Sequence, residues 1–182
     1  MKKQDNLTWI KVQTDSFTKR ICMMSLFAAL VCAGTYIAVP LPFGYFNLGD
    51  IFVLMSAWCL GPLYGAFAAG LGAALADVLM AYTVYAPATL ITKALVVVVA
   101  YFLFKVFIRL NKNNAINAVF RVLASLVGEG VMVLGYFLYE SIVLGYGMAA
   151  AASIPGNCLQ AICGVIGSVL LVTAMRKRYG VL

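Results

Sequence analysis

Long apolar runs separated by short breaks are the dominant pattern of this chain. A helix needs about 20 mostly apolar residues to cross a bilayer, and Pro, Gly and charged residues divide the sequence into runs near that length. The expected helices cover residues 17–39, 48–60, 63–82, 87–109, 118–139 and 155–175. The second of these is short for a full crossing. The pattern predicts an all-α integral membrane bundle of six transmembrane helices.

Prolines mark the boundaries near the N-terminal half. Pro40 and Pro42 cannot continue the first helix. Gly61 and Pro62 separate the second helix from the third, with Pro62 near the first helical position. We therefore expect one transmembrane domain over residues 17–182, preceded by a cytoplasmic or interfacial segment at residues 1–16, with an outer loop at residues 40–47.

Composition supports the membrane assignment and removes several kinds of chemistry. Of the 182 residues, 64% are hydrophobic and only 10% are charged, whereas about a quarter are charged in soluble domains. The chain has no histidine, which excludes imidazole metal ligands and histidine-based catalysis. It has no Gly-Lys dipeptide and hence no phosphate-binding P-loop. Its five cysteines form no Cys-x-x-Cys pair and are interpreted as packing residues. We expect no enzyme activity, no metal and no cofactor in this chain, and any ATP is hydrolysed by another subunit.

The basic residues indicate the topology. Cytoplasmic loops of membrane proteins are enriched in Lys and Arg, and every basic residue except Lys93 falls in one of three clusters that six crossings place on one side. The clusters are Lys2, Lys3, Lys11, Lys19 and Arg20; Lys105, Arg109, Lys112 and Arg121; and Arg176, Lys177 and Arg178. Both termini are therefore expected to be cytoplasmic. The net charge of +7 is interpreted as a topology signal and a contact with anionic lipid rather than with nucleic acid.

Small residues at every fourth position allow close approach between membrane helices. The third predicted helix carries Gly61, Gly65, Ala69 and Ala73 at this spacing, and is expected to be central and tightly packed. The first carries Ser25, Ala29 and Ala33. Spacing alone allows either packing inside this bundle or docking to another membrane subunit for these three.

Ionisable residues in hydrocarbon are costly and commonly functional. Lys93 is roughly 9 Å below the outer end of its helix, and Asp77 shares the outer third of the membrane, so the two are within reach of a salt bridge. Such a pair is either purely structural or part of a site. Glu129 is close to mid-membrane, so it must be protonated, hydrogen-bonded, or facing a wet cavity or ligand. Tyr136 and Glu140 follow on the same helix face.

Further polar and aromatic residues gather at the outer level. Asn157 and Gln160 are neighbours on one helix face, Asn47 precedes the second helix, and Asp50 is either a helix-start residue or a ligand contact. An interfacial aromatic belt explains many outer tyrosines and also Trp58 at the inner side. The convergence of donors, acceptors and aromatic rings at one depth predicts a small-molecule pocket. Because Asp50, Asp77, Glu129 and Glu140 oppose only Lys93, the pocket favours a ligand with donors or a positive charge.

Four motifs together carry a resemblance to a known family. They are Asn47-Leu-Gly-Asp50, Gly61-Pro-Leu-Tyr-Gly65, Ala74-Leu-Ala-Asp77 and Tyr85-Ala-Pro-Ala-Thr89-Leu-Ile-Thr-Lys93. The chain resembles the substrate-binding S components of energy-coupling factor (ECF) transporters, in the riboflavin-transporter-like branch that includes proteins assigned to pyridoxine and hydroxymethylpyrimidine.

The resemblance implies a multi-pass protein of the bacterial cell membrane that captures a small vitamin or precursor from outside under a lid. Pyridoxine or hydroxymethylpyrimidine types are favoured, with riboflavin or thiamine as further options. It also implies three partner subunits, namely a membrane coupling subunit and two cytoplasmic ATPases that consume ATP. In the family the small residues of the first helix meet the coupling subunit, so the resemblance favours docking at Ser25, Ala29 and Ala33.

Three functional hypotheses follow, of which vitamin capture by an S component leads. The alternatives are a standalone proton-coupled carrier that uses Glu129 and, last, a membrane enzyme that uses Asp77, Lys93 and Glu129. In the leading hypothesis Glu129 accepts a hydrogen bond from a ring nitrogen or amine of the ligand. The expected substrate-binding residues are Asn47, Asp77, Tyr85, Thr89, Lys93, Glu129, Tyr136, Asn157 and Gln160.

Overall fold

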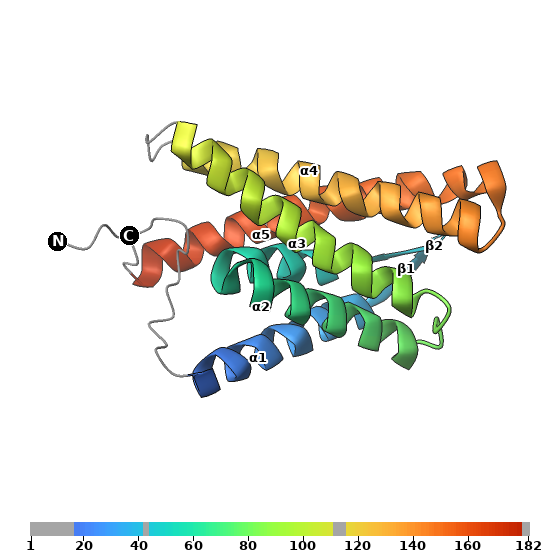
Figure 1. The fold of residues 1–182 in the computed structure, drawn as a ribbon, viewed down its shortest axis with the longest axis horizontal. Helices are drawn as coiled ribbons and strands as arrows, with labels where there is room; N and C mark the ends of the chain where they lie inside the picture. The colour runs from blue at the N-terminus through green and yellow to red at the C-terminus, as the bar shows by residue number, and fades with distance from the viewer. Residues whose placement is uncertain (1–16, 42–43, 111–115, 180–182) are drawn as a thin grey trace.

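The computed structural model describes residues 17–41, 44–110 and 116–179, and within them a helical bundle closed at one end by a β-hairpin (Figure 1). The predicted segment 1–16 and the basic residues Lys2, Lys3, Lys11 and Lys112 lie outside the described residues. Five described helical stretches are long and apolar enough to cross a membrane. In chain order the elements are α1 (Phe17–Tyr36), β1 (Ala38–Leu41), β2 (Gly44–Asn47), α2 (Gly49–Leu79), α3 (Ala86–Leu110), α4 (Asn117–Leu138), the π turn η1 (Tyr139–Val143), the 3-10 turn η2 (Gly147–Ser153) and α5 (Ile154–Tyr179).

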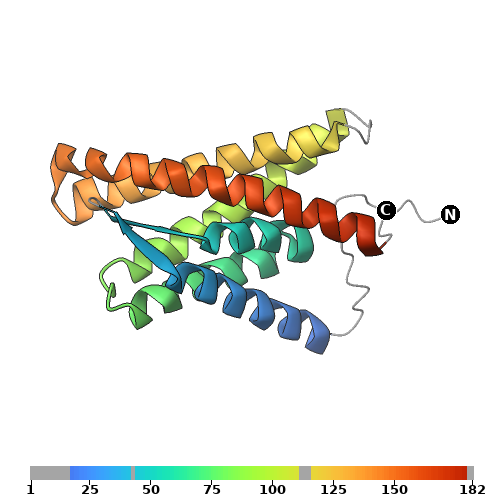
Figure 2. The ribbon, with the colours of Figure 1, turned by 180° about the vertical axis from the view of Figure 1, so that it is seen from behind.

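The second and third predicted helices are the two halves of α2, which reverses direction at Gly61. Gly61 has φ 79° and ψ −173°, a conformation that favours glycine, and Pro62 follows it. The Ser56 hydroxyl donates to the carbonyl of Gly65 over 3.1 Å. That contact brings together residues nine positions apart, which a continuous helix would hold about 13 Å apart. The two halves therefore lie side by side, as both views show (Figures 1 and 2).

The second half of α2 is at the centre of the bundle, which confirms the expectation from its small residues. Ala68, Ala69 and Ala73 are fully buried. A side chain added at Gly72 would place its Cβ 2.4 Å from the carbonyl oxygen of Ala28 in α1, and one at Gly70 would lie 2.7 Å from that of Leu90 in α3. The backbones of α1 and α3 thus approach α2 as closely as glycine permits.

The structure corrects the interpretation of Trp58 as an interfacial belt residue. Its side chain has no exposed surface and packs edge-on against Phe104, with ring centroids 5.3 Å apart. The guanidinium of Arg121 is 5.8 Å from the Trp58 ring and 5.3 Å from the Phe104 ring. Arg121 is only 2% exposed, so this member of the predicted basic clusters lies inside the bundle and contacts aromatic faces rather than lipid headgroups.

The segment after α1 is a two-stranded antiparallel hairpin, which the all-α prediction missed. Its register pairs Ala38 with Asn47 and Val39 with Phe46. The sequence around Gly44 contains the β-branched Val39 and the aromatic Tyr45 and Phe46, and proline is tolerated in a strand that has a free edge. These features were a usable signal for strands. The hairpin matters for function because β2 carries two residues of the cavity described below.

The ends of the bundle differ in chemistry. The start of α1, the end of α3, the start of α4 and the end of α5 lie at one end of the bundle, and the hairpin and the turns after α2 and α4 lie at the opposite end (Figure 1). Among residues whose side chains are described, Lys19, Arg20, Lys105, Arg109 and Arg121 belong to the first end. We call it the basic end, and the other the hairpin end.

Close helix contact predicts a stability difference between two glycines. Gly72→Ala places a methyl group against the Ala28 carbonyl and should destabilise the fold by about 1–3 kcal/mol, the usual cost of overpacking. Gly130→Ala is the matched control because no atom lies within 4 Å of its added Cβ, and improved helix propensity should keep or slightly raise its stability. Thermal unfolding of both variants in detergent measures the difference. Equal melting temperatures would contradict the close packing of α1 on α2.

Candidate functional site

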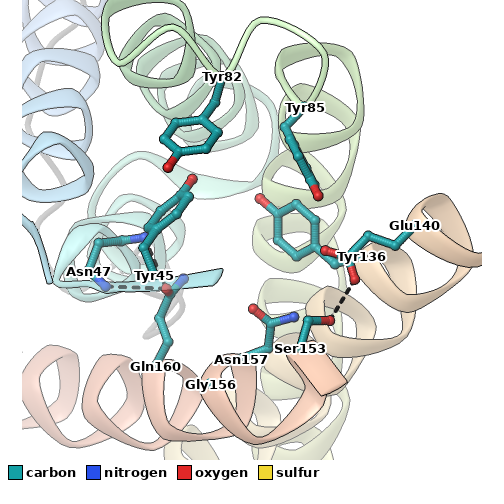
Figure 3. Close-up of a pocket in the computed structure, with 10 residues that line it drawn as sticks. All are labelled: Tyr45, Asn47, Tyr82, Tyr85, Tyr136, Glu140, Ser153, Gly156, Asn157 and Gln160. Atoms are coloured by element: carbon teal, nitrogen blue, oxygen red, sulfur yellow. Dashed lines mark hydrogen bonds between the residues drawn. The ribbon is translucent and has the colours of Figure 1, made fainter. Parts of the chain in front are cut away.

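A cavity of about 100 Å³ lies at the hairpin end, between the hairpin and the ends of α2, α3, α4 and α5 (Figure 3). Its lining is polar and aromatic. The lining residues are Tyr45, Asn47, Tyr82, Tyr85, Tyr136, Glu140, Ser153, Gly156, Asn157 and Gln160.

Tyrosine rings form one side of the cavity. The ring centroids of Tyr45 and Tyr82 are 5.4 Å apart, and those of Tyr82 and Tyr85 are 6.4 Å apart. The hydroxyl of Tyr136 shares a hydrogen bond of 2.9 Å with Thr89, which fixes this ring from α3. Such rings provide flat apolar faces with polar edges, a surface suited to a planar ligand.

Amide side chains form the opposite side, and hydrogen bonds hold two of them in place. Gln160 accepts from the side-chain amide of Asn47 over 2.9 Å and from its backbone N–H over 3.3 Å. Asn47 in turn accepts from the backbone N–H of Gly49 over 2.9 Å. The amide nitrogen of Gln160 donates to Asp50 over 2.5 Å. The end of β2 is thereby connected to α5 and α2.

Lys93 forms its ion pair with Asp50, so the predicted pairing of Lys93 with Asp77 is wrong. The Lys93 Nζ to Asp50 Oδ1 distance is 2.5 Å, and the two side chains are 3% and 1% exposed. The second oxygen of Asp50 accepts from Gln160, so Asp50 bonds to side chains of α3 and α5. Lys93 also lies 5.7 Å from the centre of the Tyr136 ring. The ion pair thus sits directly beneath the cavity lining.

Asp77 bonds to the hairpin. Its Oδ1 atom accepts a hydrogen bond of 2.9 Å from the hydroxyl of Tyr45, and its side chain is fully buried. Burial, followed by the nearby Tyr136 and Asp77, raises the pKa of Tyr45 well above its usual value. Tyr45 therefore stays protonated and remains a donor, which anchors the middle of β2 to the end of α2.

Glu129 lies deeper than the cavity. It is 1% exposed, and neither carboxyl oxygen has a hydrogen-bond partner within the described part of the chain. A Cβ added at Gly164 would lie 3.5 Å from Glu129 Oε1 and 2.8 Å from the Cβ of Asp50. Gly164 is one helical turn beyond Gln160 on α5. The Glu129 carboxyl group therefore lies about one turn deeper in the bundle than the Gln160 amide that lines the cavity.

Glu140 belongs to the cavity lining. It lies in the π turn η1, where the backbone N–H of Leu144 donates to the carbonyl of Tyr139 over 3.0 Å. The hydroxyl of Ser153 donates to Glu140 Oε2 over 2.6 Å. Burial and then the charge of Glu140 raise the pKa of Tyr85 to about 12, so the Tyr85 hydroxyl next to Glu140 is a donor at neutral pH.

The predicted site residues separate into two layers. Asn47, Tyr85, Tyr136, Asn157 and Gln160 line the cavity. Asp77, Thr89, Lys93 and Glu129 lie behind this lining, and the first three contact lining side chains. The prediction omitted five lining residues, namely Tyr45, Tyr82, Glu140, Ser153 and Gly156. Sequence reasoning places Glu140 and the outer tyrosines at this depth, but sequence alone does not show which way their side chains point.

A separate apolar groove of about 690 Å³ runs between α1 and the second half of α2. Ser25, Ala29 and Ala33 line it and are exposed. Their small side chains therefore form a shallow groove on the surface of the bundle, and docking of a partner at this groove stays a prediction. Within residues 17–41, 44–110 and 116–179, no group of three His, Cys, Asp or Glu side chains is placed to hold a metal ion.

Three comparisons with known proteins each find similar chains. Residues 16–177 match the family model described as ECF-type riboflavin transporter, S component. A Pyrococcus woesei protein described only as an uncharacterized protein in the gap 3′ region is 35% identical over 145 residues, which cover 79% of this chain and 90% of the relative. A solved structure titled "Structure and mechanism of the S component of a bacterial ECF transporter" superposes with a TM-score of 0.71 at 22% identity, covering 89% of this chain and 98% of the other. That likeness shows the fold.

The buried ion pair predicts strong coupling between two substitutions. Lys93→Met leaves Asp50 buried without its cation and should destabilise the fold by about 3–5 kcal/mol. Lys93→Met combined with Asp50→Asn removes both charges and keeps the hydrogen bond to Gln160, so it should recover most of that loss. A double-mutant cycle built from the melting temperatures of both single variants and the double variant in detergent measures this coupling. Simple additivity of the two single effects would show that the pair is not coupled.

Proposed function

The chain belongs to the family of ECF-type riboflavin transporter S components, and we propose that it captures a small vitamin or vitamin precursor from outside the cell for ATP-driven import by partner subunits. The family is one of transporters, not enzymes, and its members are multi-pass membrane proteins. The single observation that carries the proposal is a polar, aromatic cavity at the hairpin end of a membrane bundle, opposite the basic end.

The cavity is the proposed binding site. Its lining residues Asn47, Tyr85, Tyr136, Asn157 and Gln160 supply aromatic faces and amide groups, and Asp77, Thr89, Lys93 and Glu129 support them from behind. A small cavity walled by four tyrosines suits a single aromatic ring better than the three fused rings of riboflavin. We therefore favour a ligand of the pyridoxine or hydroxymethylpyrimidine type.

Access from outside is the proposed orientation. If the two halves of α2 count separately, the bundle has six helical segments, and the start of α1 and the end of α5 share the basic end. The positive-inside rule then assigns that end to the cytoplasm and the hairpin end to the exterior. In this arrangement the hairpin covers the cavity and acts as its lid. The bacterial cell membrane is the proposed location.

Partner subunits are proposed to supply energy and movement. Two cytoplasmic ATPases, which the family resemblance implies, would hydrolyse ATP, because this sequence itself contains no P-loop. A membrane coupling subunit would dock at the groove that contains Ser25, Ala29 and Ala33, because small exposed residues admit a partner helix closely.

Binding without partners is the first expected outcome. The purified chain in detergent should bind one of pyridoxine, hydroxymethylpyrimidine, riboflavin or thiamine with a Kd in the nanomolar range, at one ligand per chain, by isothermal titration calorimetry. Tyr136→Phe, which removes the hydroxyl bonded to Thr89, should weaken binding by about fivefold to tenfold. Vesicles that contain only this chain should not accumulate the ligand on a proton gradient. Accumulation there would instead support the standalone carrier.

If the coupling subunit docks at this groove, a substitution there should block transport without changing ligand binding. Ala29→Trp fills the groove and should abolish ligand uptake by cells that express the complete transporter, while the ligand affinity of the purified variant stays unchanged. Ala118→Trp is the matched control, because Ala118 is an exposed alanine on α4, away from the groove. Normal uptake by the Ala29→Trp variant would place the coupling subunit elsewhere.

A further inference from the structure

We propose that Glu140 selects the charge of the ligand, and that the ligand is a single-ring heteroaromatic compound with a protonated amine or ring nitrogen. This inference rests on the proposed function of the cavity. It replaces Glu129 with Glu140 as the carboxyl group that contacts the ligand.

The other buried carboxyl groups of the described bundle are not part of the cavity lining. Asp50 is paired with Lys93 and bonded to Gln160. Asp77 accepts from Tyr45. Glu129 faces the layer around Gly164, one turn deeper. Among the ten lining residues, Glu140 is acidic and none is basic, so the charge that a ligand meets is negative.

Glu140 retains capacity to accept from a ligand. An ionised carboxyl group offers about four acceptor positions. Ser153 occupies one of them at Oε2 and the neighbouring Tyr85 hydroxyl is placed to take a second, which leaves about two for a ligand. Ser153 is the last residue of η2, just before α5, and its hydrogen bond holds the carboxyl group at the cavity wall (Figure 3). A charge-assisted hydrogen bond from an ammonium or pyridinium N–H would be short and strong in this half-enclosed position.

The tyrosine wall favours the same charge. The faces of aromatic rings carry negative potential and attract cations, and four of the lining residues are tyrosines. Tyr85 lies next to Glu140 in the close-up, with its hydroxyl directed to the same side of the cavity (Figure 3). A flat cationic ring therefore finds a stacking surface and a counter-charge together.

The geometry also disfavours anionic ligands. A ligand carboxylate placed near Glu140 would meet a like charge at low dielectric, and the lining offers no Lys or Arg to compensate. Lys93 is not available for this purpose, because Asp50 holds its ammonium group beneath the lining.

A matched series of three compounds tests the proposal. Pyridoxamine, pyridoxine and 4-pyridoxate share one ring and differ at a single substituent, which is an ammonium, a hydroxymethyl group and a carboxylate respectively. Calorimetry on the purified full chain should give the tightest binding for pyridoxamine and the weakest for 4-pyridoxate. Glu140→Gln should reduce the preference for pyridoxamine over pyridoxine by at least about tenfold.

Two further variants separate charge selection from general damage. Glu129→Gln makes the same chemical change on α4 outside the lining, and it should leave the ratio of the two affinities within about twofold even if both affinities fall. Tyr146→Phe alters an exposed ring near η1 that does not line the cavity and should change neither affinity. Melting temperatures in detergent verify that each variant is folded.

The outcomes distinguish the inference from the proposed function. Loss of the pyridoxamine preference in Glu129→Gln, and not in Glu140→Gln, overturns the assignment of Glu140. Tight binding of riboflavin with no binding of the three single-ring compounds also overturns it, while vitamin capture stands. If neither these compounds nor hydroxymethylpyrimidine, riboflavin or thiamine bind, the proposed function fails and the inference fails with it.

Discussion

The ion pair between Lys93 and Asp50 is the constraint around which the hairpin end is organised. Two charges in the hydrocarbon region are tolerated only when each satisfies the other and the remaining hydrogen-bonding positions are filled. Asp50 meets this condition by accepting from Lys93 with one oxygen and from Gln160 with the other. Because Gln160 then holds Asn47, one buried charge pair fixes the relative positions of α2, α3, α5 and the end of β2.

Small residues make this arrangement possible. A side chain at Gly49 would place its Cβ 2.1 Å from the Thr35 hydroxyl oxygen, and one at Gly164 would meet the Cβ of Asp50 at 2.8 Å. Both glycines lie beside the polar layer, and both let neighbouring segments approach until the polar side chains come within bonding distance. The large apolar residues mostly face outward instead, as Leu63, Phe67 and Leu71 of α2 do. This distribution is expected where lipid, rather than water, surrounds the bundle.

The sequence predicted the bundle because apolar length and proline breaks are local signals. The turn at Gly61 was predicted for the same reason, because a Gly-Pro pair commonly interrupts a helix. The ion-pair partner of Lys93, by contrast, is not determined by the local sequence. Depth along the helices places Lys93 level with Asp77. In the structure the first half of α2 brings Asp50 closer to Lys93 instead. Two carboxyl groups at similar depth are equally good candidates from sequence alone, so the sequence could not choose between them. The orientation of Glu140 depends on the π turn η1, which has no simple sequence signature. The two strands were a missed local signal.

The contacts around the cavity differ in strength between its floor, which is the Lys93–Asp50 ion pair, and its rim, which is the hairpin. This difference bears on how a ligand would enter. Breaking the floor means separating a buried ion pair, at about 3–5 kcal/mol. The hairpin is held more lightly. Tyr45 and Asn47 are two positions apart on β2 and thus point to the same face; one bonds to Asp77 and the other to Gln160. Asn47 makes two such bonds, and each hydrogen bond contributes about 1–3 kcal/mol net, with bonds to charged groups at the upper end. The hairpin contacts would therefore separate before the ion pair does, and in the proposed function a ligand would exchange past the hairpin without the bundle itself opening.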